Sequence, residues 1–172
     1  MIENIKTKNS IQEAIIIIII SIVLSFIYNL FSPKSIPLIK EVDQIEYISD
    51  QELFQNIHYD SLEHKSVTTK QMLDLINNRN AIILDARNAE AYRKGHIPNA
   101  INIPFLDVFN FVDKLQMIPR DTLIVVYCEG VNCELSHHLS EFMRGMNFTR
   151  ILHYAGGYEE WIKNKLPVEK TD

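Results

Sequence analysis

The stretch DTLIVVYCEGVNCELSHHLSEFMRGM, residues 121–146, holds the pattern that decides the fold. Its first part, DTLIVVYC at 121–128, is a nearly continuous apolar run, typical of a strand buried on both faces of a parallel sheet. Its last part, LSHHLSEFMRGM at 135–146, has the spacing of a helix with one apolar face. That face is formed by Leu135, Leu139, Phe142 and Met143. A buried strand that leads through a short loop into a helix is typical of an α/β protein.

The segments on either side repeat this alternation. Residues 66–80, SVTTKQMLDLINNRN, predict a helix that starts with a capping box of Thr68 and Gln71 and carries Met72, Leu75 and Ile76 on one face. Further strands are predicted at AIILDA (81–86), AINIP (100–104) and TRILHYA (149–155), and further helices at FLDVFNFVDKL (105–115) and GGYEEWIKNK (156–165). Together they predict an α/β fold with a central, mainly parallel sheet and helices on its faces.

The N-terminal region differs in kind. Residues 14–31, AIIIIIISIVLSFIYNLF, contain no charge, and as a helix they would span roughly 27 Å, about the thickness of a bilayer core. A buried core helix would need a larger protein around it, and a cleaved signal peptide has a shorter apolar region followed by a small-residue cleavage site. We therefore expect an uncleaved transmembrane signal anchor, preceded by a tail at 1–13 and followed by a linker of uncertain structure at 32–65.

The basic residues around the span give only a weak orientation signal. Lys6 and Lys8 precede it, and Lys34 and Lys40 follow it, so the positive-inside rule barely distinguishes the two ends. We expect a single-pass membrane protein with a cytoplasmic N-terminus and the domain at 66–170 outside the cytoplasm.

Composition excludes several classes of protein. A formal net charge of −5 lacks the basic balance typical of nucleic-acid binding, so no nucleic-acid partner is expected. Two cysteines cannot form a disulfide scaffold, and the fold must therefore rest on a hydrophobic core.

Cys128 stands where the central strand ends and a helix follows, which is where functional sites gather in parallel sheets. Backbone N–H groups at such a position lower the pKa of a thiol and bind anions. The loop EGVNCEL, 129–135, contains no Arg or Lys, and Glu129 and Glu134 would oppose a phosphate dianion. A phosphate-binding cysteine loop usually has an arginine, so these residues favour sulfur chemistry over phosphate chemistry.

Four stretches carry a resemblance to a known family. They are AIILDARNAEAYRKGHIPNAINIP (81–104), LIVVYC (123–128), LSHHLSEFMRGMNFTRILHYAGGYEEW (135–161) and LPVE (166–169). In them the chain resembles the rhodanese-like sulfurtransferase domain. The positions that fit the family pattern are Asp85, Arg87, Glu90, Tyr92, Gly95, His96, Ile97, Pro98, Ala100, Gly156, Gly157 and Trp161.

The resemblance implies a sulfurtransferase in which Cys128 carries sulfur as a persulfide. The apolar span at 14–31, which the resemblance does not cover, adds the expectation that this enzyme is membrane-anchored. The donor would be thiosulfate or a similar small sulfur anion, and the acceptor a thiol, a redox partner protein near the membrane, or cyanide. No metal or organic cofactor is implied. The persulfide would be bound by backbone N–H groups of Glu129, Gly130, Val131, Asn132, Cys133 and Glu134. The loop is longer than the family's common one, so donor and acceptor do not carry over.

Other roles of these residues stay open. Cys133 is either a resolving thiol that forms a disulfide with Cys128 or a small residue that packs the loop base. A zinc site from these cysteines with His137 and His138 misses the usual ligand spacing, and adjacent histidines diverge on a helix. The supporting residues Asp85, Arg87 and His96 are expected to fix turns, with Arg87 pairing with Asp85 or Glu90.

Two alternative functions remain. The first is a membrane-tethered thiol redox protein that uses Cys128 and Cys133. The second is a non-catalytic rhodanese-like binding module, although such modules usually lack the cysteine that this chain retains.

Overall fold

The computed structural model describes residues 2–32, 45–55 and 65–171, and the chain divides into two compact units, 1–43 and 44–172. The first unit contains one helix, α1 (Ile2–Phe31). Within it, Ile11–Phe31 has a mean hydropathy of 2.7 and no buried part, so it is long and apolar enough to cross a membrane. The predicted linker at 32–65 falls largely on residues outside those described.

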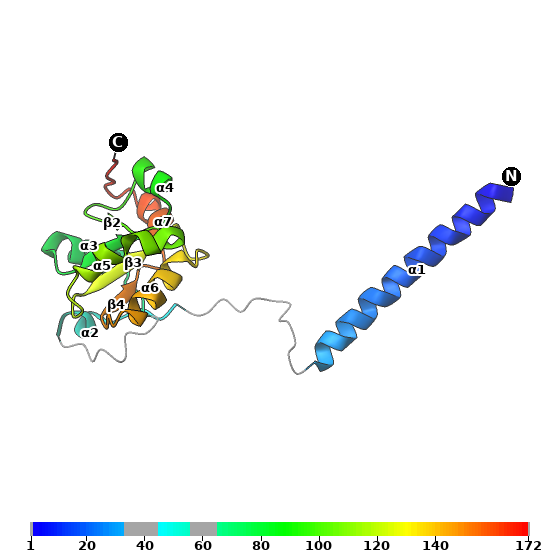
Figure 1. Cartoon of the computed structure of the whole chain (residues 1–172), viewed down its shortest axis with the longest axis horizontal. Coiled ribbons are helices and arrows are strands. Elements are labelled where there is room, and N and C mark those ends of the chain that lie inside the picture. Colours follow the sequence, from blue (N-terminus) through cyan, green and yellow to red (C-terminus); the bar gives the residue numbers. More distant parts are fainter. Residues whose placement is uncertain (1, 33–44, 56–64, 172) are drawn as a thin grey trace. The chain divides into compact units, whose positions relative to one another are not determined.

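The second unit is an α/β domain built on four parallel strands in the order β2-β1-β3-β4 (Figure 1). This confirms the predicted fold class. Along the chain its elements are α2 (Asp50–Gln55), α3 (Thr69–Asn78), β1 (Ile82–Asp85), α4 (Ala89–Lys94), β2 (Ile101–Asn102), the 3₁₀ helix η2 (Phe105–Phe111), α5 (Val112–Gln116), β3 (Ile124–Tyr127), α6 (Leu135–Gly145), β4 (Ile151–His153) and α7 (Gly157–Lys163).

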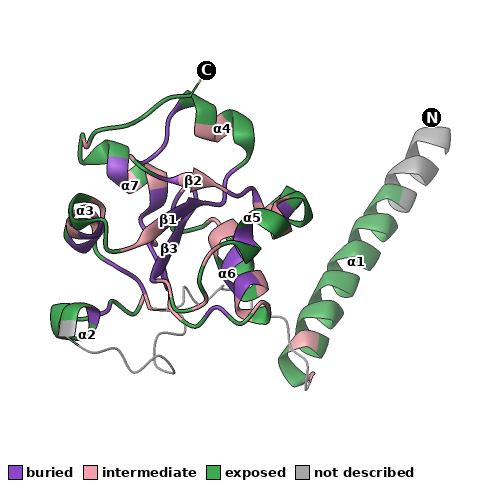
Figure 2. Cartoon of the chain, turned by 60° about the vertical axis from the view of Figure 1, so that its left-hand side comes forward, coloured by how far each residue is buried: buried purple, intermediate pink, exposed green. Residues whose placement is uncertain are grey.

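Strands β1, β3 and β4 are largely buried because helices cover each face of the sheet, whereas β2 at its edge is half-buried (Figure 2). Alternate strand residues point to opposite sides, so β3 divides its side chains between two cores. Val125 and Tyr127 join the core beneath α3 and α7, whereas Ile124 and Val126 join the core beneath α5 and α6. Cys128 continues the second set.

The segment before α3 packs onto the domain. Ile48 and Leu53 are buried in the core with α3, and the backbone N–H of Ile48 donates to the Ser66 carbonyl at 2.9 Å. Ser66 in turn forms a parallel bridge with His153, which extends the sheet beyond β4. Within the predicted linker at 32–65, the described residues 45–55 therefore include the short helix α2 and cover the core. Residues 56–64 lie outside those described.

The helix expected over 105–115 is broken. Residues 105–111 form the 3₁₀ helix η2, Asp107 has non-helical dihedrals (φ −115°, ψ 18°), and α5 occupies only the end. Val108 and Leu115 are buried as expected, whereas Phe109 is 79% exposed. Aromatic and β-branched residues lose side-chain freedom in an α-helix, so tertiary packing decides the conformation here.

The capping box predicted at the start of α3 is present. Thr68 Oγ1 accepts from the Gln71 N–H at 3.3 Å, and Gln71 Oε1 accepts from the Thr68 N–H at 2.9 Å. Gln71 is also buried, and its amide donates to the Ile48 carbonyl at 2.9 Å. The Gln71 side chain therefore caps α3 and also binds the preceding segment through Ile48.

We expect Thr68→Ala to lower the free energy of unfolding by about 1 kcal/mol because one N-terminal amide of α3 loses its acceptor. The measurement is urea unfolding of the full chain in detergent, followed by the fluorescence of Trp161, the single tryptophan. Thr149→Ala is the matched control, since that exposed side chain makes no hydrogen bond within the described residues, and it should leave stability unchanged. Equal losses in both variants would contradict this role for the cap.

Candidate active-site loop

The loop that starts at Cys128 follows β3 and leads into α6. Because β1 and β3 run parallel in register, Asp85 at the end of β1 lies beside Tyr127 at the end of β3. The sheet therefore brings the Asp85–Arg87 turn next to the cysteine loop. Cys128 is only 2% exposed and packs in the core with Leu139 and Met143 of α6.

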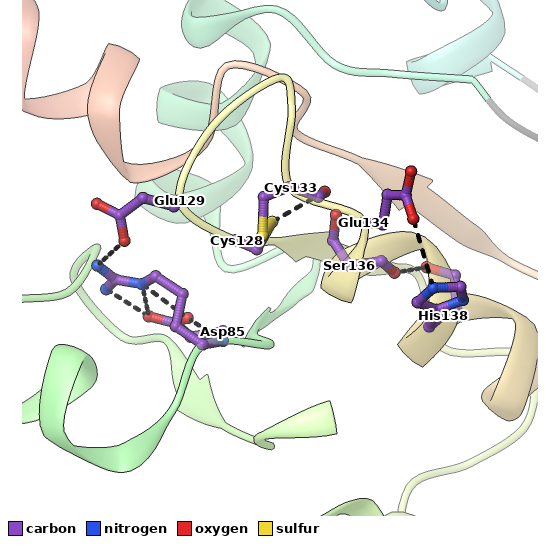
Figure 3. The surroundings of a disulfide bond; sticks show 9 residues. Asp85, Cys128, Glu129, Cys133, Glu134, Ser136 and His138 are labelled. Carbon is purple, nitrogen blue, oxygen red and sulfur yellow. Dashed lines mark hydrogen bonds and ion pairs between the residues drawn. A yellow bond between two sulfur atoms is a disulfide. The ribbon is translucent and has the colours of Figure 1, made fainter. Parts of the chain in front are cut away.

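The two cysteines are joined within this loop (Figure 3). Their sulfur atoms form a disulfide, and their Cα atoms are 6.3 Å apart, inside the usual disulfide range of about 4.4–6.8 Å. A turn brings them together: the N–H of Cys133 donates to the Gly130 carbonyl at 3.0 Å. Two interpretations of Cys133 were left open, a resolving thiol and a packing residue. The bond between its sulfur and that of Cys128 is the contact that a resolving thiol requires.

The loop N–H groups that were predicted to bind a persulfide differ in whether they already donate a hydrogen bond within the protein. The N–H of Cys133 is occupied by the turn and is not available to an anion in this conformation. Among the residues described, the N–H groups of Glu129, Gly130, Val131 and Asn132 donate to no protein acceptor. Backbone N–H groups without an internal partner in one short loop are the groups that anion-binding loops use.

The start of α7 holds the start of the loop. The N–H of Tyr158 donates to the Cys128 carbonyl at 2.9 Å, and the N–H of Glu159 donates to the Glu129 carbonyl at 2.8 Å. Gly157 has a φ of +59°, and a Cβ there would lie 2.6 Å from the Cys128 carbonyl oxygen. Only glycine meets both requirements without strain, so the Gly-Gly pair of the sequence acts through its contact with the cysteine loop.

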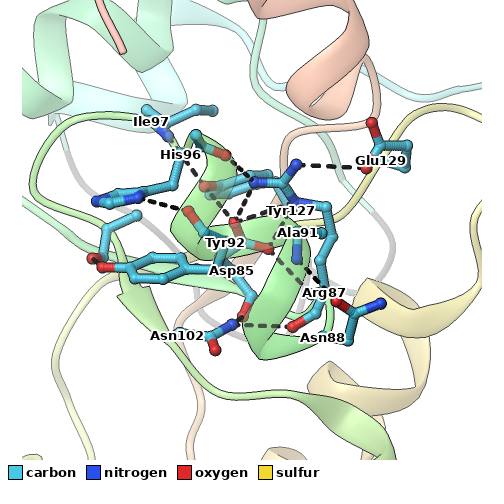
Figure 4. Close-up of polar contacts among 12 residues, drawn as sticks. Asp85, Arg87, Asn88, Ala91, Tyr92, His96, Ile97, Asn102, Tyr127 and Glu129 are labelled. Carbon is cyan, nitrogen blue, oxygen red and sulfur yellow. Dashed lines mark hydrogen bonds and ion pairs between the residues drawn. The ribbon is translucent and has the colours of Figure 1, made fainter. Parts of the chain in front are cut away.

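Beside the loop, Arg87 and Asp85 form a buried ion pair (Figure 4). Both nitrogens on one edge of the guanidinium contact the carboxylate, with the shortest distance 2.6 Å from Nη2 to Oδ2. Arg87 also donates to the Gly95 carbonyl at 2.8 Å and reaches Glu129 Oε2 at 3.3 Å. Its guanidinium carbon lies 4.1 Å from the centre of the Tyr158 ring.

Tyr127 completes this network. Its hydroxyl donates to Asp85 Oδ2 at 2.7 Å and accepts from the N–H of Ile97 at 3.1 Å. The hydroxyl therefore joins the end of β3 to the Gly-His-Ile-Pro turn. Glu90, the other partner considered for Arg87, pairs with Lys94 instead.

Burial and the contacts with Asp85 shift the pKa of both Arg87 and Tyr127. Burial by itself would lower the pKa of Arg87, but the hydrogen bond and the charge of Asp85 outweigh it and raise that pKa. Burial, followed by the nearby charge of Asp85, raises the pKa of Tyr127 well above the usual value for a phenol. Both groups therefore stay protonated near neutral pH, and their hydrogen bonds join the cysteine loop to the neighbouring turns.

The ring contacts of His96 and His138 are with residues other than the two cysteines. His96 is buried and stacks on Tyr92 with ring centres 3.7 Å apart, and its Nδ1 lies 2.9 Å from the Tyr92 carbonyl. His138 stacks on Phe105 and lies 3.8 Å from Glu134. Among the described residues, no three His, Cys, Asp or Glu side chains gather in a way that could hold a metal ion.

The comparisons with known proteins identify the family. The model of the rhodanese-like domain matches residues 68–164, more than half of the chain, and the protein belongs to this family. A relative from Buchnera aphidicola subsp. Schizaphis graminum, described as an uncharacterized protein, is 27% identical over 156 residues, which cover 91% of this chain and 92% of that protein. That match is too long to be confined to the rhodanese-like domain.

Two further proteins are similar over the domain. The thiosulfate sulfurtransferase/rhodanese-like domain-containing protein 3 of Mus musculus is 29% identical, covering 63% of this chain and 74% of that protein. The crystal structure of the BH2092 protein from Bacillus halodurans superimposes with a TM-score of 0.54 at 31% identity, covering 59% of this chain and 74% of that one. The chain therefore shares its domain with proteins whose names include sulfurtransferase.

Two residues of the site, Tyr127 and Tyr158, did not emerge from the sequence. Tyr127 reads as one more apolar residue of the central strand, and its hydroxyl contact with Asp85 depends on strand register. Tyr158 follows the Gly-Gly pair, but its contact with Arg87 joins segments far apart in the chain. The signal available in the sequence was a tyrosine at the end of a buried strand. Its hydroxyl needs a hydrogen-bond partner, and Asp85 ends another strand of the same parallel sheet.

Gly157→Ala should destabilise the domain by more than about 1 kcal/mol because alanine strains the positive φ and collides with the Cys128 carbonyl. Gly145→Ala is the matched control, since a Cβ there meets nothing within 4 Å. It should be neutral or should stabilise α6 by up to about 1 kcal/mol. Urea unfolding of both variants checks this, and a tolerated Gly157→Ala would contradict the close approach of α7.

Arg87→Met should lower the free energy of unfolding by about 3–5 kcal/mol because the buried Asp85 carboxylate loses its charged partner. Arg93→Met changes the same atoms on the exposed face of α4 and should cost less than about 0.5 kcal/mol. Thermal and urea unfolding of the two variants measure the difference. Similar stability of both would show that the ion pair is not needed for the fold.

Proposed function

We propose that this protein is a membrane-anchored sulfurtransferase that passes sulfane sulfur through a persulfide on Cys128. The observation that carries the proposal is the loop after β3, where a buried cysteine is followed by four consecutive backbone N–H groups with no acceptor among the described residues. Such groups stabilise an anion that is bound to the cysteine sulfur. Membership of the rhodanese-like family supports the same chemistry.

The reaction has two steps. In the first, the Cys128 thiolate attacks the outer sulfur of thiosulfate, the S–S bond of the donor breaks, and sulfite leaves with the bonding electrons. Cys128 then carries a persulfide anion, which the loop amides stabilise. In the second step an external thiolate, or cyanide in an assay, takes the outer sulfur and restores the Cys128 thiolate.

The acidic residues of the loop are compatible with an anionic donor. Glu129 lies 3.3 Å from the Arg87 guanidinium, and this contact holds its carboxylate at the Asp85–Arg87 pair. Glu134 lies 3.8 Å from the ring of His138 and points away from Cys128 in Figure 3. The loop itself contains no Arg or Lys, which favours a sulfur donor over a phosphate ester.

We propose that the apolar helix keeps this chemistry beside a membrane. We propose that residues 14–31 anchor the chain as a single span and that the domain lies outside the cytoplasm. The sulfur acceptor would then be a small thiol or a redox protein that works near the membrane. The hydropathy and exposure of Ile11–Phe31 support the anchor.

A thiol redox protein is the second candidate, and the disulfide between Cys128 and Cys133 is the observation that favours it. In that case the pair would exchange electrons with a partner dithiol, and both cysteines would be essential. The two functions therefore differ in what they require of Cys133.

Cys128→Ser should abolish sulfur transfer, with a loss on the order of a thousandfold or more, because the nucleophile is removed. The assay uses the full chain in detergent, freshly reduced and freed of reductant, with thiosulfate as donor and cyanide as acceptor, and measures thiocyanate. Cys133→Ser is the control and should still form thiocyanate. Disulfide exchange that is lost in both variants, without thiocyanate formation in either the wild type or Cys133→Ser, would identify the redox protein instead.

A further inference from the structure

The geometry points to a second activity of the loop: Cys133 acts as an internal acceptor that releases the sulfur from Cys128 as sulfide and closes the disulfide. We infer that the protein thereby reduces sulfane sulfur, with a dithiol as the external reductant. This inference rests on the proposed persulfide on Cys128 and adds a second fate for it.

The inference depends on which sulfur Cys133 can reach. In the structure the Cys133 sulfur is bonded to Sγ of Cys128, which is the inner sulfur of the persulfide once a second sulfur is attached. The turn from Gly130 to Cys133 holds this approach, while α7 holds the carbonyls of Cys128 and Glu129. A thiol positioned on the inner sulfur breaks the persulfide, whereas a thiol on the outer sulfur would only carry it onward.

The step balances in atoms and electrons. The Cys133 sulfur attacks Sγ of Cys128, the bond between Sγ and the outer sulfur breaks, and the outer sulfur leaves with both electrons. The proton of the Cys133 thiol goes to this leaving group, which departs as hydrosulfide. The two cysteines are oxidised to the disulfide, and the sulfane sulfur is reduced to sulfide. With thiosulfate as donor, the loop consumes one thiosulfate and two thiols and yields sulfite, hydrosulfide and one disulfide.

The loop with its disulfide formed also determines which sulfur atom the external reductant attacks first. With the disulfide formed, Cys128 is 2% exposed, whereas Cys133 is half-buried and follows the exposed residues Val131 and Asn132. An incoming dithiol therefore meets the Cys133 sulfur first, and Cys128 leaves as the thiolate that accepts the next sulfur. Until then no further donor can react.

A single-turnover experiment tests the inference. The full chain in detergent is reduced, freed of reductant and mixed with a small excess of thiosulfate, and sulfite, sulfide and the intact mass are measured. The wild type should yield equal amounts of sulfite and sulfide and lose two hydrogens. Cys133→Ser should yield the same sulfite, less than about a tenth of the sulfide, and retain one added sulfur. Cys128→Ser should yield neither product. Reduction of the wild type with dithiothreitol, removal of the dithiothreitol and a second addition of thiosulfate should repeat this sulfide release.

The outcomes separate this inference from the proposed function. A wild type that retains the added sulfur and releases no more sulfide than Cys133→Ser would overturn the inference and leave the sulfurtransferase intact. The same holds if peptide mass spectrometry finds the added sulfur on Cys133, since that result means attack on the outer sulfur. A reduced wild type that yields neither sulfite nor bound sulfur would overturn the proposed function and, with it, this inference.

Discussion

The buried ion pair between Asp85 and Arg87 is the constraint on which the site depends. A charge inside a protein must be paired and hydrogen-bonded, and here the partners come from four different segments. The carboxylate accepts from Tyr127 at the end of β3, and the guanidinium reaches the Gly95 turn and Glu129 in the cysteine loop. One pair of opposite charges thus fixes the ends of two neighbouring strands and the loop between β3 and α6.

The cysteine loop is also held by α7, which binds carbonyl groups of the loop but not its N–H groups. The carbonyls of Cys128 and Glu129 are engaged by α7, whereas the N–H groups that follow have no acceptor in the described part of the chain. Acceptors are satisfied and donors are left over, so the loop presents partial positive charge without containing a basic residue. The proposed binding of a small anion at Cys128 would rest on these N–H groups.

The sequence predicted the fold well because the decisive signals are local. The apolar run of β3, the capping box of Thr68 and the spacing of Leu139 and Met143 each depend on a few neighbouring residues. The break at Asp107 was not predictable because packing against α6 overrides the helical pattern there. For the site, the position of Cys128 at a strand end before a helix was predicted, whereas its proximity to the Asp85 turn depends on the strand order and register that the structure shows. The contact of Tyr158 with Arg87 and the turn that occupies the Cys133 amide depend on tertiary packing and left no local signal.

The parallel order of the sheet has a consequence for synthesis of the chain. No two of the four strands are joined by a hairpin. In the chain β2 comes between β1 and β3, yet β3 pairs directly with β1, and Ser66 at the start of the domain pairs with His153 near its end. Contacts between such distant segments form slowly, and a ribosome adds only about 5–20 residues each second. The amides that hold Cys128 come from α7, one of the last elements to emerge. Cys128 therefore lacks this support during most of translation, and its loop reaches the final conformation only when nearly the whole chain is available to fold.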